Sequence, residues 1–150
     1  MNICFICHAN ICRSFAAERL FNALAEKNGK SNLKAFSRGV YASPAYEIPS
    51  KIKKFLEDNG ASWQGHCSTL LGREDVERAD LLLVMTEDQL DLIMDKFPQY
   101  ADKIFLLLDY AFGLEEDMPD PISKSGRGFE KIMNRLKEAA EAVFKKVSAA

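Results

Sequence analysis

The sequence has little net charge, few histidines and no long apolar run. Its 20 lysines and arginines nearly balance 22 acidic residues, so the formal net charge is −2. This balance provides no broad electrostatic attraction to nucleic acid or to a membrane surface. No run of about 20 apolar residues predicts a membrane-spanning helix, and no segment resembles a signal peptide. We therefore expect no nucleic-acid partner, no membrane insertion and a reducing, cytoplasmic location.

Cysteine and histidine are too sparse, and wrongly spaced, for a metal site. The chain has four cysteines and two histidines. Cys4 and Cys7 have the Cys-x-x-Cys spacing of redox and zinc motifs, but both fall within a predicted strand. No second Cys/His pair follows at the spacing of a zinc site. We expect no metal and no other cofactor.

Strand-like apolar runs alternate along the chain with apolar residues at helical spacing. The length suits one hydrophobic core, so we predict a single domain over residues 1–150. The alternation predicts a three-layer α/β fold, in which helices flank a four-stranded parallel sheet with flavodoxin-like topology. The expected strands are 2–7, 34–39, 81–85 and 104–108, and the expected helices begin near residues 13, 49, 86 and 128.

Cys7 lies at the carboxyl end of the first predicted strand, where ligands bind in sheets of this kind. The following helix begins near Arg13, so the residues between must turn back tightly. Successive backbone N–H groups then point inward above the positive end of the helix dipole, and such a nest binds a tetrahedral dianion. The same donors stabilise a thiolate on Cys7. Arg13 adds a planar fork that can hold two phosphoryl oxygens.

The pattern Cys-x5-Arg is weak evidence alone, but its surroundings are specific. The segment CHANICRS at 7–14 joins a predicted strand to a predicted helix, and PDP occurs at 119–121. These motifs resemble the bacterial type of the low molecular weight protein tyrosine phosphatases. The resemblance extends over most of the chain and includes SRGVYASP at 37–44, GHCS at 65–68 and ADLLLVMT at 79–86.

The resemblance implies a metal-independent phosphatase that hydrolyses phosphotyrosine through a phosphocysteine intermediate. Cys7 matches the nucleophile, and Arg13 matches the residue that clamps the phosphoryl group. Asp120 matches the acid that protonates the leaving oxygen and then helps to activate water. From the residues alone, Asp117 competes with Asp120 for this role.

The resemblance also assigns the residues that shape and support the loop. The phosphate-binding loop contains His8, Ala9, Asn10, Ile11, Cys12 and Ser14. Ser14 matches the hydroxyl that donates to the thiolate, and Asn10 matches a residue that holds the loop's shape, since asparagine tolerates positive φ. Ser37 and His66 match its supporting partners. Cys12 matches a cysteine that can form a disulfide with the nucleophile under oxidation, and simple packing is an equally weighted role for it.

The sequence departs from the pattern of this family at several positions. Ala9 replaces a glycine, which would cost on the order of 1 kcal/mol if that position required positive φ. Phe15 replaces a proline and is expected near the rim of the site. Ile122 follows the Asp-Pro pair where many members have aromatic residues. The expected walls of the substrate slot are Phe15, Tyr41, Tyr46 and Ile122.

Three alternatives to a tyrosine phosphatase are open. Similar enzymes hydrolyse phosphoarginine and have threonine at the position of Ile11, whereas an apolar residue there suits an aromatic ring. We therefore expect phosphotyrosine-containing proteins as substrates, with a cognate tyrosine kinase as one candidate by analogy. Arsenate reductases of this fold need further downstream cysteines, and only Cys67 is present. A catalytically impaired phosphate-binding module is the third alternative.

Overall fold

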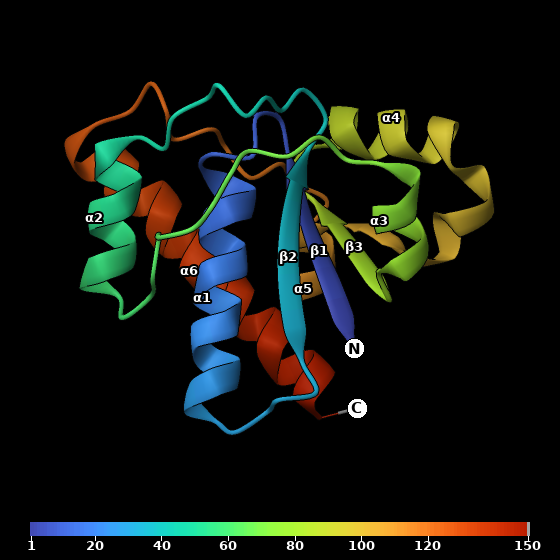
Figure 1. Ribbon diagram of the computed structural model, residues 1–150, viewed down its shortest axis with the longest axis horizontal. Helices are drawn as coiled ribbons and strands as arrows, with labels where there is room; N and C mark the ends of the chain where they lie inside the picture. Colours follow the sequence, from blue (N-terminus) through green and yellow to red (C-terminus); the bar gives the residue numbers. More distant parts are fainter. Residues whose placement is uncertain (150) are drawn as a thin grey trace.

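Four parallel strands form one sheet, in the order β2-β1-β3-β4, in the computed structural model, which describes residues 1–149 (Figure 1). The strand order reverses between β1 and β3, at the switch point of a flavodoxin-like fold. The predicted fold is therefore confirmed. The strands are β1 (Asn2–Cys7), β2 (Lys34–Gly39), β3 (Leu81–Val84) and β4 (Ile104–Leu106).

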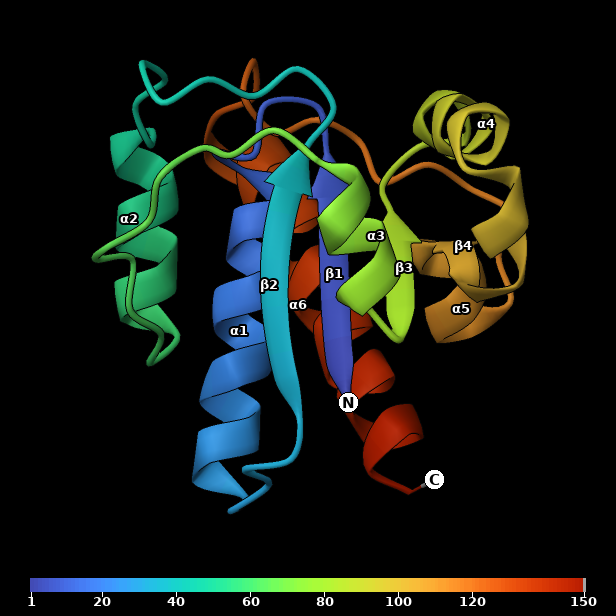
Figure 2. The same ribbon diagram turned by 45° about the vertical axis from the view of Figure 1, so that its right-hand side comes forward.

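Helices cover both faces of this sheet (Figure 2). One face is covered by α1, α2, α5 and α6, and the other by α3, α4 and the short 3-10 helix η1. The helices are α1 (Arg13–Lys27), α2 (Ser50–Asp58), α3 (Arg73–Arg78), α4 (Glu87–Lys96), η1 (Pro98–Lys103), α5 (Leu107–Phe112) and α6 (Gly126–Ser148).

The central strand β1 contributes to two hydrophobic cores, because successive side chains of a strand point to opposite faces. Ile3 and Phe5 enter the core beneath α1 and α6, and Phe21 of α1 packs on Phe5 with ring centroids 6.1 Å apart. Cys4 and Ile6 enter the core on the other face. All four side chains are fully buried. Cys7 is therefore placed at the end of a strand that is held from both sides.

Three predicted elements have different boundaries in the structure, and α3 and η1 were not predicted. The third strand ends at Val84, one residue before the predicted end. The fourth strand ends at Leu106, because Leu107 and Leu108 are both buried in the core beneath α6. Neighbouring residues of a strand face opposite sides, whereas the first turn of a helix can bury both toward one core. These two residues accordingly begin α5. The last helix begins at Gly126, two residues before the predicted start.

The carboxyl ends of the strands meet at one edge of the sheet, at the top of Figure 1. The loop after β1, the loop of residues 40–49 after β2 and the segment 113–125 before α6 all lie at this edge. Residues from the first and last of these segments line one cavity. The parallel sheet thus gathers residues that are more than 100 positions apart in the chain.

Candidate active site

A cavity of about 260 Å³ lies at this edge of the sheet. Its lining unites the nucleophile, cation and acid that the sequence pattern indicates: Cys7, Arg13 and Asp120. Cys7 and Arg13 are buried and Asp120 is exposed. The remaining lining residues are His8, Ala9, Ile11, Cys12 and Ile122.

A directed chain of hydrogen bonds ends on the thiol of Cys7. The Ser37 hydroxyl donates to Glu18 Oε1 at 2.7 Å, because a carboxylate can only accept. Ser37 Oγ is then free to accept from Asn10 Nδ2, which donates its other hydrogen to Ser14 Oγ, both at 2.9 Å. The Ser14 hydroxyl therefore has its own hydrogen to donate to Cys7 Sγ, 2.9 Å away. Because the last hydroxyl of the chain donates to the sulfur, this direction of hydrogen bonding favours negative charge on the sulfur.

Asn10 also shapes the loop through its backbone conformation and its hydrogen bonds to residues outside the loop. Its φ of 60° is the only positive value at a non-glycine residue among residues 1–149, which confirms the prediction for this position. Its side-chain oxygen accepts the Thr69 N–H at 3.1 Å, and its carbonyl lies 2.7 Å from His66 Nε2. Ala9 lies outside the positive region, so the condition under which alanine would be costly at this position is not met.

The helix that follows the loop leaves its first N–H groups available to an anion. The first four N–H groups of an α-helix have no partner within the helix. The N-cap of α1 is Cys12, and no side chain in the described part of the chain caps this end. The positive end of the helix dipole therefore lies at a residue that lines the cavity.

Arg13 is oriented by a main-chain segment that sequence reasoning missed. Its Nη1 donates to the Met118 carbonyl at 2.8 Å, and its Nη2 lies 3.8 Å from Asp120 Oδ2. Met118 is itself tied to the end of β3, because its N–H donates to the Met85 carbonyl at 2.8 Å. The guanidinium and the segment that carries Asp120 therefore occupy fixed positions relative to each other.

The two candidate acids have different environments. Asp117 Oδ1 accepts the Glu87 N–H at 2.8 Å and so caps the N-terminus of α4. Asp120 Oδ1 accepts the Ile122 N–H at 3.0 Å, which turns Oδ2 toward Arg13. Of the two, Asp120 lines the cavity.

Gly39 is a second feature that sequence reasoning missed. A Cβ added there would lie 2.6 Å from the His8 carbonyl oxygen and 3.0 Å from the Asn10 nitrogen. The loop lies this close because the Val40 and Tyr41 N–H groups donate to the carbonyls of Cys7 and His8. The end of β2 is thus in close contact with the loop and hydrogen-bonds to it.

The expected substrate wall needs correction, because the residues that line the cavity do not include Phe15, Tyr41 or Tyr46. Phe15 is fully buried and stacks on His66, with ring centroids 3.9 Å apart and planes 13° apart, so it supports the loop from behind. The position is the first turn of α1, whose buried face holds the ring away from the cavity. Ile122 lines the cavity. Tyr41 is exposed and its ring lies 4.9 Å from that of His8, while Tyr46 is exposed in the same loop.

Burial shifts the pKa values of two groups near the loop. It lowers the pKa of His66 below its ordinary value of 6.5, more than the hydrogen bond to the Asn10 carbonyl raises it. His66 is therefore neutral at pH 7, and its Nε2 donates to this carbonyl. Burial, aided by the charge of Cys7, raises the pKa of Cys12 to about 12, so Cys12 is a neutral thiol. Neither Cys7 nor Cys12 forms a disulfide within the described residues.

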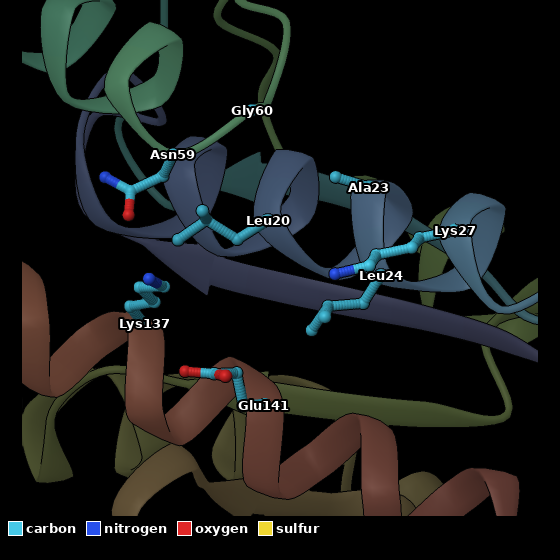
Figure 3. Close-up of a pocket in the computed structure, with 8 residues that line it drawn as sticks. All are labelled: Leu20, Ala23, Leu24, Lys27, Asn59, Gly60, Lys137 and Glu141. Atoms are coloured by element: carbon cyan, nitrogen blue, oxygen red, sulfur yellow. The ribbon is translucent and has the colours of Figure 1, made fainter.

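A larger cavity, of about 360 Å³, lies elsewhere in the molecule (Figure 3). Leu20 and Leu24 of α1 face Lys137 and Glu141 of α6 across it. No cysteine, serine or histidine is among the described residues that line it. Within residues 1–149, no helix is long and apolar enough to cross a membrane, and no group of three or more candidate ligands converges on a metal position.

Comparison with known proteins decides the family. The family model of the low molecular weight phosphotyrosine protein phosphatases matches residues 2–150. The chain belongs to this family. This low molecular weight phosphatase is 35% identical over 148 residues to a protein-arginine-phosphatase of Bacillus subtilis, with 98% of this chain and 97% of the relative covered. Its family implies phosphoprotein substrates.

Two solved structures share the fold of this phosphatase closely. The low molecular weight protein tyrosine phosphatase from T. tengcongensis has a TM-score of 0.90 at 32% identity, with 97% of this chain and 99% of that chain covered. The YwlE arginine phosphatase has a TM-score of 0.90 at 33% identity, with coverages of 99% and 96%, and was solved as a mutant with a phosphorylated active-site serine. Overall similarity therefore does not separate the two substrates.

Proposed function

We propose that this phosphatase hydrolyses phosphotyrosine in proteins, with Cys7 as the nucleophile. The observation that carries the proposal is the hydrogen bond of 2.9 Å between Ser14 Oγ and Cys7 Sγ, in a cavity that also contains Arg13 and Asp120. The hydroxyl stabilises a thiolate, which is the reactive form of cysteine. Cys7, Arg13 and Asp120 then supply the nucleophile, the phosphoryl clamp and the proton donor.

The reaction proceeds in two displacement steps. Cys7 Sγ attacks the phosphorus atom as the bond to the phenolic oxygen breaks, and Asp120 donates a proton to that oxygen. Water then attacks the phosphocysteine while Asp120 accepts a proton, which releases inorganic phosphate and restores the thiolate. Arg13 and the free N–H groups at the start of α1 stabilise the charge on the equatorial oxygens in both steps.

The preference for tyrosine rests on the apolar lining of the cavity. Ile11 and Ile122 both line it, and neither side chain offers a hydrogen-bond acceptor to a guanidinium. An aromatic ring buries apolar surface against such side chains without an unpaired polar group. The 35% identity to a protein-arginine-phosphatase makes phosphoarginine the second candidate. A cognate tyrosine kinase is one candidate among the phosphotyrosine-containing proteins.

The test compares initial rates of hydrolysis of a phosphotyrosine peptide and a phosphoarginine peptide of the same sequence, near pH 6, with EDTA and a thiol reductant. We expect kcat/KM to be higher for phosphotyrosine. A higher kcat/KM for phosphoarginine would make phosphoarginine the substrate, and it would leave the roles of the catalytic residues unchanged. No turnover of either peptide would favour a phosphate-binding module.

The variant Cys7→Ser separates catalysis from binding. We expect it to lose turnover while it still binds the phosphotyrosine peptide, because the N–H groups and Arg13 are unchanged. Turnover by Cys7→Ser at the wild-type rate would exclude Cys7 as the nucleophile.

A further inference from the structure

Lys51 forms a contact with the acid-bearing segment that neither the sequence motifs nor the family match assign. It lies in the first turn of α2, and its Nζ donates to three main-chain carbonyls, those of Pro121, Ile122 and Lys124, at 3.3, 2.9 and 2.5 Å. An ammonium group has three hydrogens, so these bonds use its full donor capacity. In Figure 1 the segment before α6 passes over this end of α2.

The segment that carries Asp120 depends on few other contacts. Residues 113–125 are exposed except for Met118 and Pro121. Met118 ties the segment to Arg13 and to the end of β3 before the acid. After the acid, Lys51 is the only side chain within residues 1–149 that hydrogen-bonds the main chain of 119–125 from outside it. Its ammonium also lies 5.0 Å from the centre of the Phe129 ring, at the start of α6.

The contact reaches Asp120 through one intermediate peptide. Lys51 binds the carbonyls of the two residues after Asp120, and the N–H of the second, Ile122, donates to Asp120 Oδ1. That bond leaves Oδ2 directed toward Arg13, at 3.8 Å. A shift of the Ile122 peptide would therefore move the carboxylate relative to the site of phosphoryl transfer.

We propose that Lys51 is a positioning residue of this phosphatase, whose ammonium fixes the main chain after Asp120 and so places the proton donor over the cavity. The inference rests on the proposed function of Asp120 as general acid. Lys51 does not line the cavity and touches no reacting atom, so it acts only through the segment that it holds.

The test uses two aryl phosphates, because a good leaving group needs little proton donation and a poor one needs much. We would measure kcat/KM, which reports the steps up to release of the phenol, for 4-nitrophenyl phosphate and for phenyl phosphate. For Lys51→Met we expect a loss of about 10-fold to 100-fold with phenyl phosphate and a smaller loss, below about threefold, with 4-nitrophenyl phosphate. In an Asp120→Asn background, Lys51→Met should cause no further loss with either ester.

Lys54→Met is the matched control. Lys54 lies on the same helix, and its ammonium pairs with Asp58, 3.2 Å away on the surface. This variant should hydrolyse both esters as the wild type does. Lys51→Gln provides a second variant with a shorter, neutral side chain, and it should show the same selective loss.

The outcomes separate this inference from the proposed function. Three outcomes would overturn the role of Lys51: an equal loss with both esters, no loss with either, or a further loss in the Asp120→Asn background. None of them would contradict the proposed phosphatase function. Absence of turnover by the wild type with both esters would overturn the proposed function, and the role of Lys51 with it.

Discussion

At the residue scale, Asp117 and Asp120 form a natural pair for testing the general acid. We predict that Asp120→Asn lowers kcat/KM for phenyl phosphate by about 10²-fold to 10⁴-fold, the usual contribution of general acid catalysis. Asp117→Asn keeps an oxygen that accepts the Glu87 N–H, so its kcat/KM should stay within about twofold of the wild type. Steady-state kinetics of both variants check this. Equal losses would show that the carboxylate at 120 has no special role.

Asn10 combines a backbone conformation with four hydrogen bonds, and two substitutions separate them. Glycine adopts positive φ freely, whereas alanine pays about 1 kcal/mol there. We predict that Asn10→Gly is more stable than Asn10→Ala by about this amount in urea unfolding. Both variants should lose activity alike, because each removes the amide that orients the Ser14 hydroxyl. If Asn10→Gly kept wild-type kcat, that amide would have no part in catalysis.

We expect Ile11 to influence the choice between the two substrates, because its side chain lines the cavity. We predict that Ile11→Thr lowers the ratio of kcat/KM for phosphotyrosine to that for phosphoarginine, because the added hydroxyl can accept a hydrogen bond from a guanidinium at the cavity wall. The measurement is a competition between the two peptides, with Ile11→Val as the control that keeps the apolar wall. A ratio unchanged by threonine would place the specificity elsewhere.

Some residues of the site could be predicted from the sequence and others could not. The difference lies in how far apart in the chain the interacting residues are. Cys7, Asn10, Arg13 and Ser14 lie within eight positions between a strand and a helix, so local pattern and family resemblance place them together. Met118 is 105 positions from Arg13 and contributes only a carbonyl. Any residue can provide a carbonyl, so no side-chain pattern marks it.

At the element scale, the contact between the end of β2 and the loop after β1 is tight enough to be tested. In Gly39→Ala the new Cβ would lie 2.6 Å from the His8 carbonyl, a backbone atom that can move only with the loop. We predict a loss of kcat/KM of about 10-fold to 100-fold from this displacement. Gly72→Ala is the control, since the nearest atom there is the flexible Asp75 side chain at 3.8 Å. Wild-type kinetics for Gly39→Ala would show that the loop tolerates the shift.

Elements with a local signal were predicted closely, and those without one were not. Thr86 and Gln89 form the capping box that begins α4, as the sequence indicates. β2 has the predicted bounds, Lys34–Gly39. Helix α3 has six residues and buries only Val76, so its apolar periodicity is too short to detect. The change from β4 to α5 depends on the core beneath α6, which becomes visible only in the folded chain.

At the scale of the whole molecule, His66 couples the loop to the pH dependence of stability. Its pKa is lowered in the folded state, mainly by burial, whereas the unfolded chain has the ordinary value of about 6.5. Above this value His66 is neutral in both states. As the pH falls through 6.5 toward the folded value, the unfolded chain takes up the proton first, so the free energy of unfolding decreases.

We therefore predict that wild type loses more stability than His66→Gln when the pH falls from 7.5 to 5. The difference in free energy of unfolding between the two should be largest above pH 7 and shrink on acidification, as measured by urea unfolding at each pH. A constant difference between wild type and His66→Gln would mean that the hydrogen bond to Asn10 and the stack on Phe15 hold the loop equally well in both protonation states.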